Sequence, residues 1–340
     1  MWKSDGEWRT GRFFFVFVVA GSLLLSHGRA ATASGNSSGN ARQDRTIPLE
    51  GTDEAWIVST RCVPFSCPTG IGPERFSYQV SRGVCAGWEQ ADSEAFFAGA
   101  AADRPVIVFV HGNRAGFCDA VNDGWPVYQR LRCESGGRPF QFVIWSWPAD
   151  QIRGGPRNDA LVKAGRSDVQ SFYLAAWLDH LPLQTPVTLI GYSFGARIIG
   201  GALHLAQGGT LLGRTSPGQD RRPVRVMLVA AALDCEWLSP GSRNGQALGA
   251  VEQMFITRNC CDPVLRLYPR MRRCDSSNAL GFASPASSTR LAQSGPVLET
   301  VGVESQVGRD HSWHSYFRSY AVRSRLAQYA FLAEGQPVAE

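Results

Sequence analysis

Residues 187–207 read VTLIGYSFGARIIGGALHLAQ, and the predicted fold starts from this segment. The run 187–192 is apolar and rich in β-branched side chains, which predicts a buried strand. A helix is expected from Ala196 to Gln207. Between them, residues 191–195 form a G-x-S-x-G motif with Ser193 at its centre. Strand, tight turn and helix in this order are the setting of a nucleophile elbow, which presents its serine at the carboxyl end of a strand.

The motif carries meaning only in this context. Residues 35–39 (GNSSG) match the same pattern, with no strand before them and no helix after them. In an elbow the glycines are needed because the strained turn brings neighbouring backbones close together, where a Cβ would clash. The alternative interpretation is an ordinary β–α turn that contains a serine, so other parts of the chain must decide between the two.

From Pro105 onward, short apolar runs alternate with helical patterns. This alternation predicts an α/β fold with a mostly parallel central sheet and helices on both faces. The runs that predict buried strands are 106–110, 140–145, 187–192, 224–233, 254–257 and 297–304. A helix is expected to contain the apolar face of residues 169–177, and a last one runs from about Ser315 to Leu332. Residues 55–60 and 76–81 are expected to add antiparallel edge strands.

A serine hydroxyl is a weak nucleophile that needs an adjacent base, oriented by a third group. In elbow enzymes these follow the serine in the order carboxylate, then histidine. Asp262 lies just after the 254–257 strand, and Pro263 favours a loop there. His311 lies before the predicted last helix, so the order is met. Asp234 is a second candidate for the acid and His314 a second candidate for the base.

The remaining histidines favour structural roles. His180 and His204 lie within helical patterns, and His111 is expected to shape a loop. His311 and His314 have the spacing of a metal pair, but no acidic cluster accompanies them. The sequence contains no dinucleotide fingerprint, P-loop or H-E-x-x-H motif, so neither a cofactor nor a metal is expected.

Over residues 105–333 the chain resembles the α/β-hydrolase superfamily. The resemblance rests on FVHGN (109–113), GYSFG (191–195), an aspartate after a late strand and a histidine before the last helix. IWSWPAD (144–150) is also similar to the Ser-Trp-Pro that ends a strand in bacterial α/β-hydrolase families of uncharacterised function. The resemblance implies a single hydrolase domain, expected here over residues 47–335.

This resemblance implies a serine hydrolase with Ser193 as nucleophile, His311 as base and Asp262 as the group that orients the base. By the same resemblance, the backbone N–H groups of Phe194 and Asn113 form the oxyanion hole. The implied substrate is a small-molecule or lipid carboxylic ester, with thioesters and amides as further candidates. The alternatives are an acyltransferase of the same fold and a binding protein that has lost turnover.

Many relatives insert a cap domain between two late strands. Only residues 235–254 separate these strands here, so the cap is expected to be small or absent.

The N-terminus predicts export. Basic residues precede the apolar run 13–25, and small residues around Ala30 and Ala33 offer a cleavage site, which is typical of a signal peptide over residues 1–30. Residues 31–46 are small and polar, as in a flexible linker. We therefore expect a secreted or periplasmic protein.

Nine cysteines follow the predicted signal peptide, and export would favour disulfides among them. The odd number leaves at least one thiol unpaired, and spacing does not fix the connectivity. Two local pairings are considered: Cys62 with Cys67, and Cys260 or Cys261 with Cys274.

The composition is that of a globular protein, with 44% hydrophobic and 19% charged residues among 340. It excludes a disordered, coiled-coil or collagen-like chain. A formal net charge of +5 does not require nucleic acid as a partner. The basic side chains gathered after Asp262 are expected to lie near the active site and to attract an anionic substrate or surface: Arg266, Arg270, Arg272 and Arg273.

Overall fold

The computed structural model describes residues 53–64, 70–83, 86–101, 103–215, 222, 224–271, 277–285 and 296–331. All of them belong to one unit, residues 48–340. The predicted signal peptide (1–30), the linker (31–46) and the predicted domain limits at 47 and 335 lie outside the described residues. In the part of the chain that the structure describes, no helix is both long and apolar enough to cross a bilayer.

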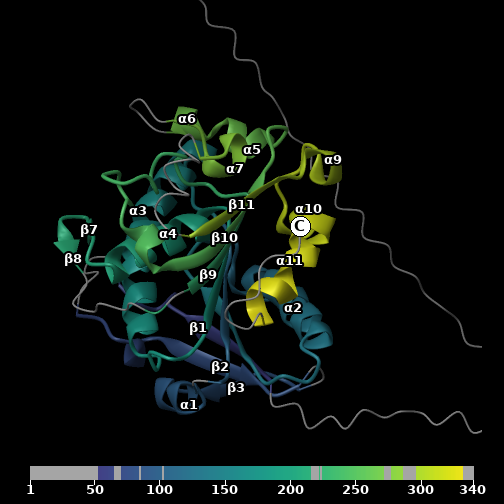
Figure 1. Ribbon diagram of the computed structural model, residues 1–340. Helices are drawn as coiled ribbons and strands as arrows, with labels where there is room; N and C mark the ends of the chain where they lie inside the picture. Colours follow the sequence, from purple (N-terminus) through teal and green to yellow (C-terminus); the bar gives the residue numbers. More distant parts are fainter. Residues whose placement is uncertain are drawn as a thin grey trace, which may run out of the picture. The chain divides into compact units, whose positions relative to one another are not determined.

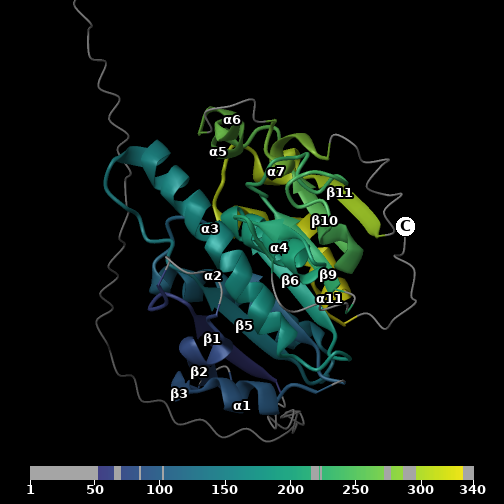
Figure 2. The ribbon, with the colours of Figure 1, turned by 90° about the vertical axis from the view of Figure 1, so that its left-hand side faces the viewer.

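A nine-stranded sheet forms the centre of the described structure (Figures 1 and 2). Its order is β11-β10-β9-β6-β4-β5-β1-β2-β3. The strands are β1 Glu54–Ser59, β2 Ser77–Ser81, β3 Glu89–Ala91, β4 Val106–Val110, β5 Gln141–Ser146, β6 Val187–Tyr192, β9 Val224–Val229, β10 Val251–Arg258 and β11 Val297–Gly302. The seven neighbouring strands β11, β10, β9, β6, β4, β5 and β1 all pair in parallel. Strand β2 pairs antiparallel with both β1 and β3. Strands β7 (Thr210–Leu211) and β8 (Arg214–Thr215) form a separate hairpin.

Helices cover both faces of the sheet. The long helices α3 (Gly155–Asp179) and α4 (Phe194–Ala206) lie on one face, and α2 (Phe117–Glu134) and α11 (Tyr320–Phe331) lie on the other (Figures 1 and 2). The shorter helices are α1 Ser93–Ala98, α5 Pro263–Arg266, α6 Tyr268–Met271, α7 Leu280–Ala283, α9 Glu304–Val307 and α10 Trp313–Arg318, with 3₁₀ turns η1 Pro73–Arg75 and η2 Ala247–Ala250.

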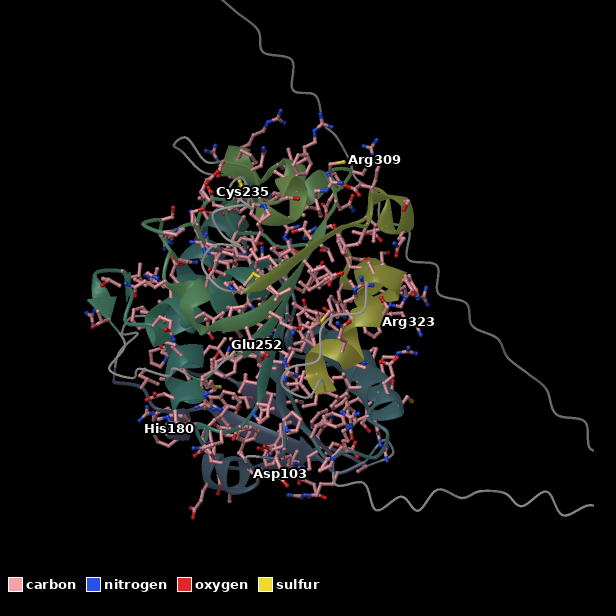
Figure 3. The ribbon with its side chains drawn as sticks, in the orientation of Figure 1. Asp103, His180, Cys235, Glu252, Arg309 and Arg323 are labelled. Atoms are coloured by element: carbon pink, nitrogen blue, oxygen red, sulfur yellow. The ribbon has the colours of Figure 1, made fainter. Side chains whose placement is uncertain are left out.

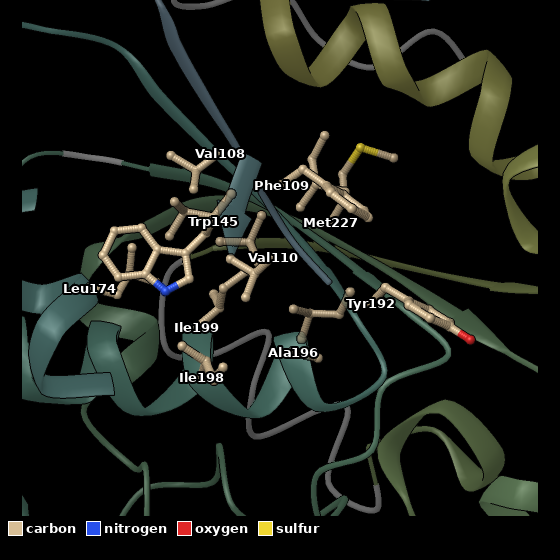
Figure 4. Close-up of a cluster of buried hydrophobic side chains, with 14 of the residues drawn as sticks. Val108, Phe109, Val110, Trp145, Leu174, Tyr192, Ala196, Ile198, Ile199 and Met227 are labelled. Carbon is tan, nitrogen blue, oxygen red and sulfur yellow. The ribbon is translucent and has the colours of Figure 1, made fainter. Parts of the chain in front are cut away.

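The core follows the alternation of the strands. Val108 and Val110 of β4 lie on the side of Ile199 from α4 (Figure 4). Phe109 points to the opposite face, where its ring packs 4.8 Å from that of Trp313 in α10. Since both faces of β4, β5, β6 and β9 are covered, every residue in these strands is buried. Their continuous apolar sequences are what a doubly covered parallel strand requires.

Two predictions about the sheet edges are wrong. Strand β1 is an interior strand that pairs in parallel with β5, and the unpredicted β3 is the edge beyond β2. Residues 55–59 are buried because both faces of β1 are covered. At the other end, β11 was expected to be buried, but it is the edge strand and Val297 is 55% exposed.

The predicted last helix is two helices, α10 and α11. Ser319 separates them with an extended backbone (φ −61°, ψ 142°). Its hydroxyl donates to the carbonyl of Tyr316 at 2.6 Å and accepts from the N–H of Val322 at 3.4 Å. The serine therefore ends one helix and caps the next, as short hydroxyl side chains do at helix termini.

The connection from β9 to β10, residues 230–250, consists of turns, bends, η2 and an isolated antiparallel bridge from Asp234 to Ala279. Strand β9 stops at Val229, four residues earlier than predicted, because the chain leaves the sheet at Ala230 (φ 49°). The place where the sequence led us to expect a small cap or none is therefore a connection of 21 residues.

Candidate active site

Ser193 lies in a strained turn between β6 and α4. Its backbone has φ 53° and ψ −114°, a region that residues other than glycine rarely occupy. The surrounding strands hold this conformation, since the Ser193 N–H donates to Val229 at 3.0 Å and its carbonyl accepts from Ala232 at 3.1 Å. Strain of this kind persists only where the surrounding structure enforces it, and it is concentrated at functional sites.

The glycines of the motif are required by close backbone contacts. A Cβ on Gly195 would overlap the carbonyl oxygen of Val110 at the end of β4. A Cβ on Gly191 would lie 2.8 Å from the backbone of Ala196. Gly112, in the FVHGN segment, is similarly constrained, because its Cβ would lie 2.8 Å from the ring of Tyr192 and 3.1 Å from the Cβ of Ser193. The loop after β4 therefore packs directly against the serine.

His311 and Asp262 reach Ser193 from two other loops. His311 lies between α9 and α10, and its Nε2 is 3.1 Å from the Ser193 Oγ. Its Nδ1 is 2.6 Å from Oδ2 of Asp262, which lies four residues after the end of β10. The Asp262 side chain is fully buried, and that of His311 is 17% exposed. Three side chains far apart in sequence thus form one chain of hydrogen bonds.

Asp262 accepts hydrogen bonds from three groups besides His311. Its Oδ1 accepts from the backbone N–H groups of Val264 at 2.9 Å and Leu265 at 3.1 Å, so it caps α5. Pro263 fits the first position of this helix, where no N–H is needed. The hydroxyl of Tyr316 donates to Oδ2 at 2.8 Å, the same oxygen that faces His311. Burial and the neighbouring carboxylate raise the pKa of Tyr316 far above its usual value, so this phenol is a neutral donor.

The loop that carries His311 is fixed by side chains on both sides. The hydroxyl of Tyr192 donates to the His311 carbonyl, and the two rings pack 5.6 Å apart. Asp310 accepts from the N–H of Ser312 at 2.9 Å and from the hydroxyl of Ser315 at 2.5 Å. Burial would raise the pKa of Asp310, but these hydrogen bonds hold it below its usual value. Sequence patterns gave no sign of Tyr192 or Tyr316 in these roles.

The two alternative residues lie elsewhere. Asp234 accepts hydrogen bonds from the Glu236 N–H and the Ser277 hydroxyl, and it is not the carboxylate that faces His311. His314 is an exposed residue of α10. Within the described residues, no three His, Cys, Asp or Glu side chains group as metal ligands.

His111 shapes its loop, as expected. Its Nε2 accepts from the Trp147 N–H at 3.1 Å, and its Nδ1 lies 2.9 Å from the Gly112 carbonyl. The Nδ1–H tautomer satisfies both contacts. Complete burial lowers the pKa of His111 to about 3, so the ring is neutral.

The two N–H groups expected to form an oxyanion hole are those of Asn113 and Phe194. Neither donates to an acceptor in the described part of the chain. Phe194 is the first residue of α4, where backbone N–H groups lack helical partners and the helix dipole is positive. Asn113 follows Gly112, which packs against Ser193.

A buried aspartate that the sequence analysis did not identify holds the Asn113 loop. Asp159 of α3 accepts from the Asn113 side chain, from Arg114 and from Lys163, each at 3.0 Å. It also accepts from the N–H of Ile152 at 3.0 Å. Although burial opposes ionisation, these donors lower the pKa of Asp159 to about 2. The loops after β4 and β5 are therefore fixed to the start of α3.

A second buried cluster fixes α4 to α3. Arg197, one turn after the serine, donates to both oxygens of Asp168 at 3.0 and 3.2 Å. Arg243 donates to the same carboxylate at 2.7 Å. Both guanidinium groups lie over the ring of Trp237, 4.6 and 4.7 Å from its centre. The short β9–β10 connection is thereby anchored beside the elbow helix.

The predicted disulfides are not confirmed. The described cysteines are all free thiols: Cys62, Cys118, Cys133, Cys235, Cys260 and Cys261. Cys67 and Cys274, their predicted partners, lie outside the described residues. Cys260 instead contacts Glu304, because its N–H donates to that carboxylate at 3.3 Å.

Of the predicted basic group, Arg266 and Arg270 are exposed on α5 and α6. Arg272 and Arg273 lie outside the described residues.

Comparison with known proteins finds similarity at the level of structure. No protein-family model matches the chain, and no curated protein is similar to it in sequence. Acyl-protein thioesterase 2 from Zea mays is 13% identical, with a TM-score of 0.37, over 66% of this chain and 92% of that one. Esterase B from Lactobacillus rhamnosis is 12% identical, with a TM-score of 0.38, over 82% and 87%. Carboxyl esterase 2 from Tuber melanosporum is 12% identical, with a TM-score of 0.35, over 81% and 89%.

With TM-scores of 0.35–0.38, these similarities carry no argument about activity. The fold is nevertheless clear from the sheet itself. Seven strands run in parallel, helices cover both faces, and a strained serine turn joins β6 to α4. This is the α/β-hydrolase fold, which confirms the fold class predicted from the sequence.

Proposed function

We propose that this protein is a secreted serine hydrolase that cleaves carboxylic esters through an acyl-enzyme on Ser193. One observation carries the proposal. The Ser193 hydroxyl, the His311 imidazole and the Asp262 carboxylate form a continuous chain, with separations of 3.1 and 2.6 Å, at a strained turn. A nucleophile, its base and an orienting acid in this geometry activate an alcohol toward carbonyl carbon.

In the proposed first step, the Ser193 Oγ attacks the ester carbonyl and His311 Nε2 takes the hydroxyl proton. The Nδ1–H of His311 donates to Asp262, which fixes the tautomer that leaves Nε2 free to accept. His311 then gives the proton to the departing alcohol as the ester C–O bond breaks. The acyl group remains bound to Ser193.

The negative charge that develops on the former carbonyl oxygen needs donors placed in advance. The free N–H groups of Phe194 and Asn113 are suited to this role. Loss of one such donor typically lowers the rate about 10²- to 10³-fold. The hydrogen bonds of Asp159 keep the Asn113 loop in place before the substrate arrives.

In the second step, water attacks the acyl carbon while His311 accepts its proton, and the carboxylic acid leaves as Ser193 regains its hydrogen. If an alcohol replaces water, the same steps give acyl transfer. Thioesters, lipids and amides are further candidates for the acyl donor.

Hydrolysis of p-nitrophenyl esters by purified variants tests the proposal. We expect Ser193→Ala to lower kcat by as much as 10⁶-fold and Asp262→Asn by roughly 10⁴-fold. His314→Ala is the matched control, because this exposed imidazole lies three residues from His311. Activity that survives Ser193→Ala would contradict the proposal. Product analysis with added alcohol separates hydrolysis from transfer.

Export is the remaining part of the proposal. It rests on the apolar run 13–25 and the small residues that follow it. N-terminal sequencing of protein recovered outside the cytoplasm is expected to begin after Ala30 or Ala33. An intact Met1 on protein that remains in the cytoplasm would contradict export.

A further inference from the structure

We propose that the edge of the molecule around Ser193 docks on the surface of an anionic lipid bilayer. The substrate that this implies, an acyl ester presented at a lipid surface, rests on the proposed function. The docking itself does not. We call this region the docking edge, and its members are the apolar side chains Phe117, Leu161, Val162, Val264 and Leu267 and the basic side chains Arg153, Arg157, Arg266, Arg270 and Arg309.

The apolar members are large side chains left in water. Their exposed fractions are 36% for Phe117, 42% for Leu161, 37% for Val162, 44% for Val264 and 47% for Leu267. Nine large hydrophobic residues are exposed in the described part of the chain, and these five follow β4, β5 and β10. Single exposed apolar residues are ordinary, but a group gathered at one site indicates an interaction surface.

The topology places all three segments at one edge. Strands β4, β5 and β10 run in parallel, so the segments that follow them leave the sheet at the same side as Ser193. Asp262 caps α5, which carries Val264, and Asp159 ties the Asn113 loop to the turn of α3 that carries Leu161. Helices α3 and α6 are in contact, and both views show the amino end of α3 beside α5 and α6 (Figures 1 and 2).

The basic members are free to meet a partner. All five are exposed, and within the described residues none of them forms an ion pair. Figure 3 shows Arg309 at this edge, close to α9.

The acidic groups nearby are already engaged. Asp150 pairs with Arg61 at 2.6 Å, and Glu304 pairs with Arg258 at 3.2 Å. Asp310 accepts hydrogen bonds from two serines, and the exposed Asp119, two residues from Phe117, accepts from the Gly116 N–H at 2.8 Å. The docking edge therefore presents unpaired positive charge beside apolar side chains.

This combination fits an anionic bilayer better than a second copy of the chain. A bilayer offers phosphate groups to the arginines and hydrocarbon just beneath them to the apolar side chains. Two copies facing each other would bring arginine against arginine, and a stable protein interface has an apolar centre depleted of charge. A soluble anionic ester would use the arginines and leave the apolar side chains in water.

Sedimentation with lipid vesicles tests the inference on the full chain. We use Ser193→Ala protein, so that no turnover alters the lipid, with phosphatidylcholine vesicles that contain or lack phosphatidylglycerol. We expect binding to the anionic vesicles at least tenfold tighter than to the neutral ones, and weaker binding in added salt. Every variant carries the same N-terminal segment, so differences between variants report on the docking edge.

Paired variants assign the binding to its residues. We expect two double variants each to bind vesicles about tenfold more weakly or worse. One combines Leu161→Ser with Leu267→Ser, and the other combines Arg266→Glu with Arg270→Glu. The matched controls are Leu183→Ser, which is 63% exposed in the loop before β6, and Arg323→Glu on α11. Both controls should bind vesicles like the parent.

The outcomes separate docking from catalysis. Equal binding to neutral and anionic vesicles, or unchanged binding by both paired variants, overturns the docking edge. A concentration-dependent dimer that the paired variants abolish assigns the edge to a second copy and also overturns it. Fluorophosphonate labelling of Ser193 in the same paired variants, otherwise wild type, should be unchanged, which shows that they fold. If the wild type is not labelled by the fluorophosphonate but the protein still binds vesicles, only the proposed hydrolase activity is contradicted.

Discussion

Replacing Tyr316 by phenylalanine removes one hydrogen bond from the buried acid and changes nothing else in the triad. Asp262 accepts four hydrogen bonds, from His311, Tyr316, Val264 and Leu265. The tyrosine bond is 2.8 Å long, and both partners are fully buried. The variant keeps the ring and its packing and loses only the donor.

The structure sets the size of the effect. A hydrogen bond to a charged group contributes about 1.5–3 kcal/mol, so the free energy of unfolding should fall by about 2 kcal/mol. The same oxygen of Asp262 orients His311, and with one fewer contact the carboxylate is held less firmly. We expect kcat to fall about tenfold, which corresponds to about 1.4 kcal/mol in the barrier, with KM unchanged.

Urea denaturation and ester hydrolysis measure the two effects, and Tyr128→Phe provides the control. The Tyr128 hydroxyl donates to Asp53 at 2.7 Å, another buried contact between a phenol and a carboxylate, far from Ser193 in the sheet. Both variants should lose similar stability, and only Tyr316→Phe should lose activity.

Equal kcat in the wild type and Tyr316→Phe, together with the expected loss of stability, would refute the positioning role. The tyrosine would then only stabilise the fold. A fall in kcat of the same size in Tyr128→Phe would show that lower stability, rather than the position of Asp262, reduces the rate.

Three further predictions concern the elbow and buried titratable groups. Gly195→Ala should prevent proper formation of the elbow and abolish activity, because its Cβ would overlap the carbonyl of Val110; a soluble, fully active variant would disprove this. Burial raises the pKa of Asp123 from 3.8 to about 7, so its stabilising protonated form is lost as the pH rises through 7. In urea denaturation, the free energy of unfolding of Asp123→Asn minus that of the wild type should therefore increase from pH 4 to pH 8. A difference that stays constant with pH would contradict this prediction. His111 stays neutral in the folded protein but binds a proton below pH 6.5 in the unfolded chain. As the pH falls from 6.5 toward 3, the free energy of unfolding of the wild type should therefore decrease relative to that of His111→Gln by up to about 1.4 kcal/mol per pH unit. Parallel pH curves for the two proteins would exclude this.

The sequence predicts the parts of the fold that depend on local pattern. The apolar runs at 106–110 and 187–192 coincide with β4 and β6, since a strand covered on both faces needs a continuous apolar sequence. The sequence does not predict which strands pair with one another. The apolar character of residues 55–59 marks a strand, but nothing in it says that β1 lies inside the sheet and pairs in parallel with β5.

The candidate site divides in the same way. Motif, order and loop position single out Ser193, Asp262 and His311, because each follows or precedes a recognisable element. Residues that support them cannot be found by spacing. Tyr316 lies on a helix whose orientation toward position 262 depends on the whole fold.

Asp159 illustrates why supporting residues are missed. With Lys163 it forms an (i, i+4) pair, which in a helix usually indicates a solvated surface. In the structure both side chains are buried, and the aspartate also accepts hydrogen bonds from Asn113 and Arg114 in the loop after β4. Only the packing of α3 across the ends of β4 and β5 gives this pair its role.

We propose that the fold makes one hydroxyl of this chain reactive. Reaction with a fluorophosphonate, followed by intact mass and peptide mapping, measures this directly. We expect a single adduct on Ser193 that forms slowly or not at all in His311→Ala and is absent from Ser193→Ala. If the correctly folded wild type forms no adduct, or if His311→Ala forms it equally fast, Ser193 is not activated by His311.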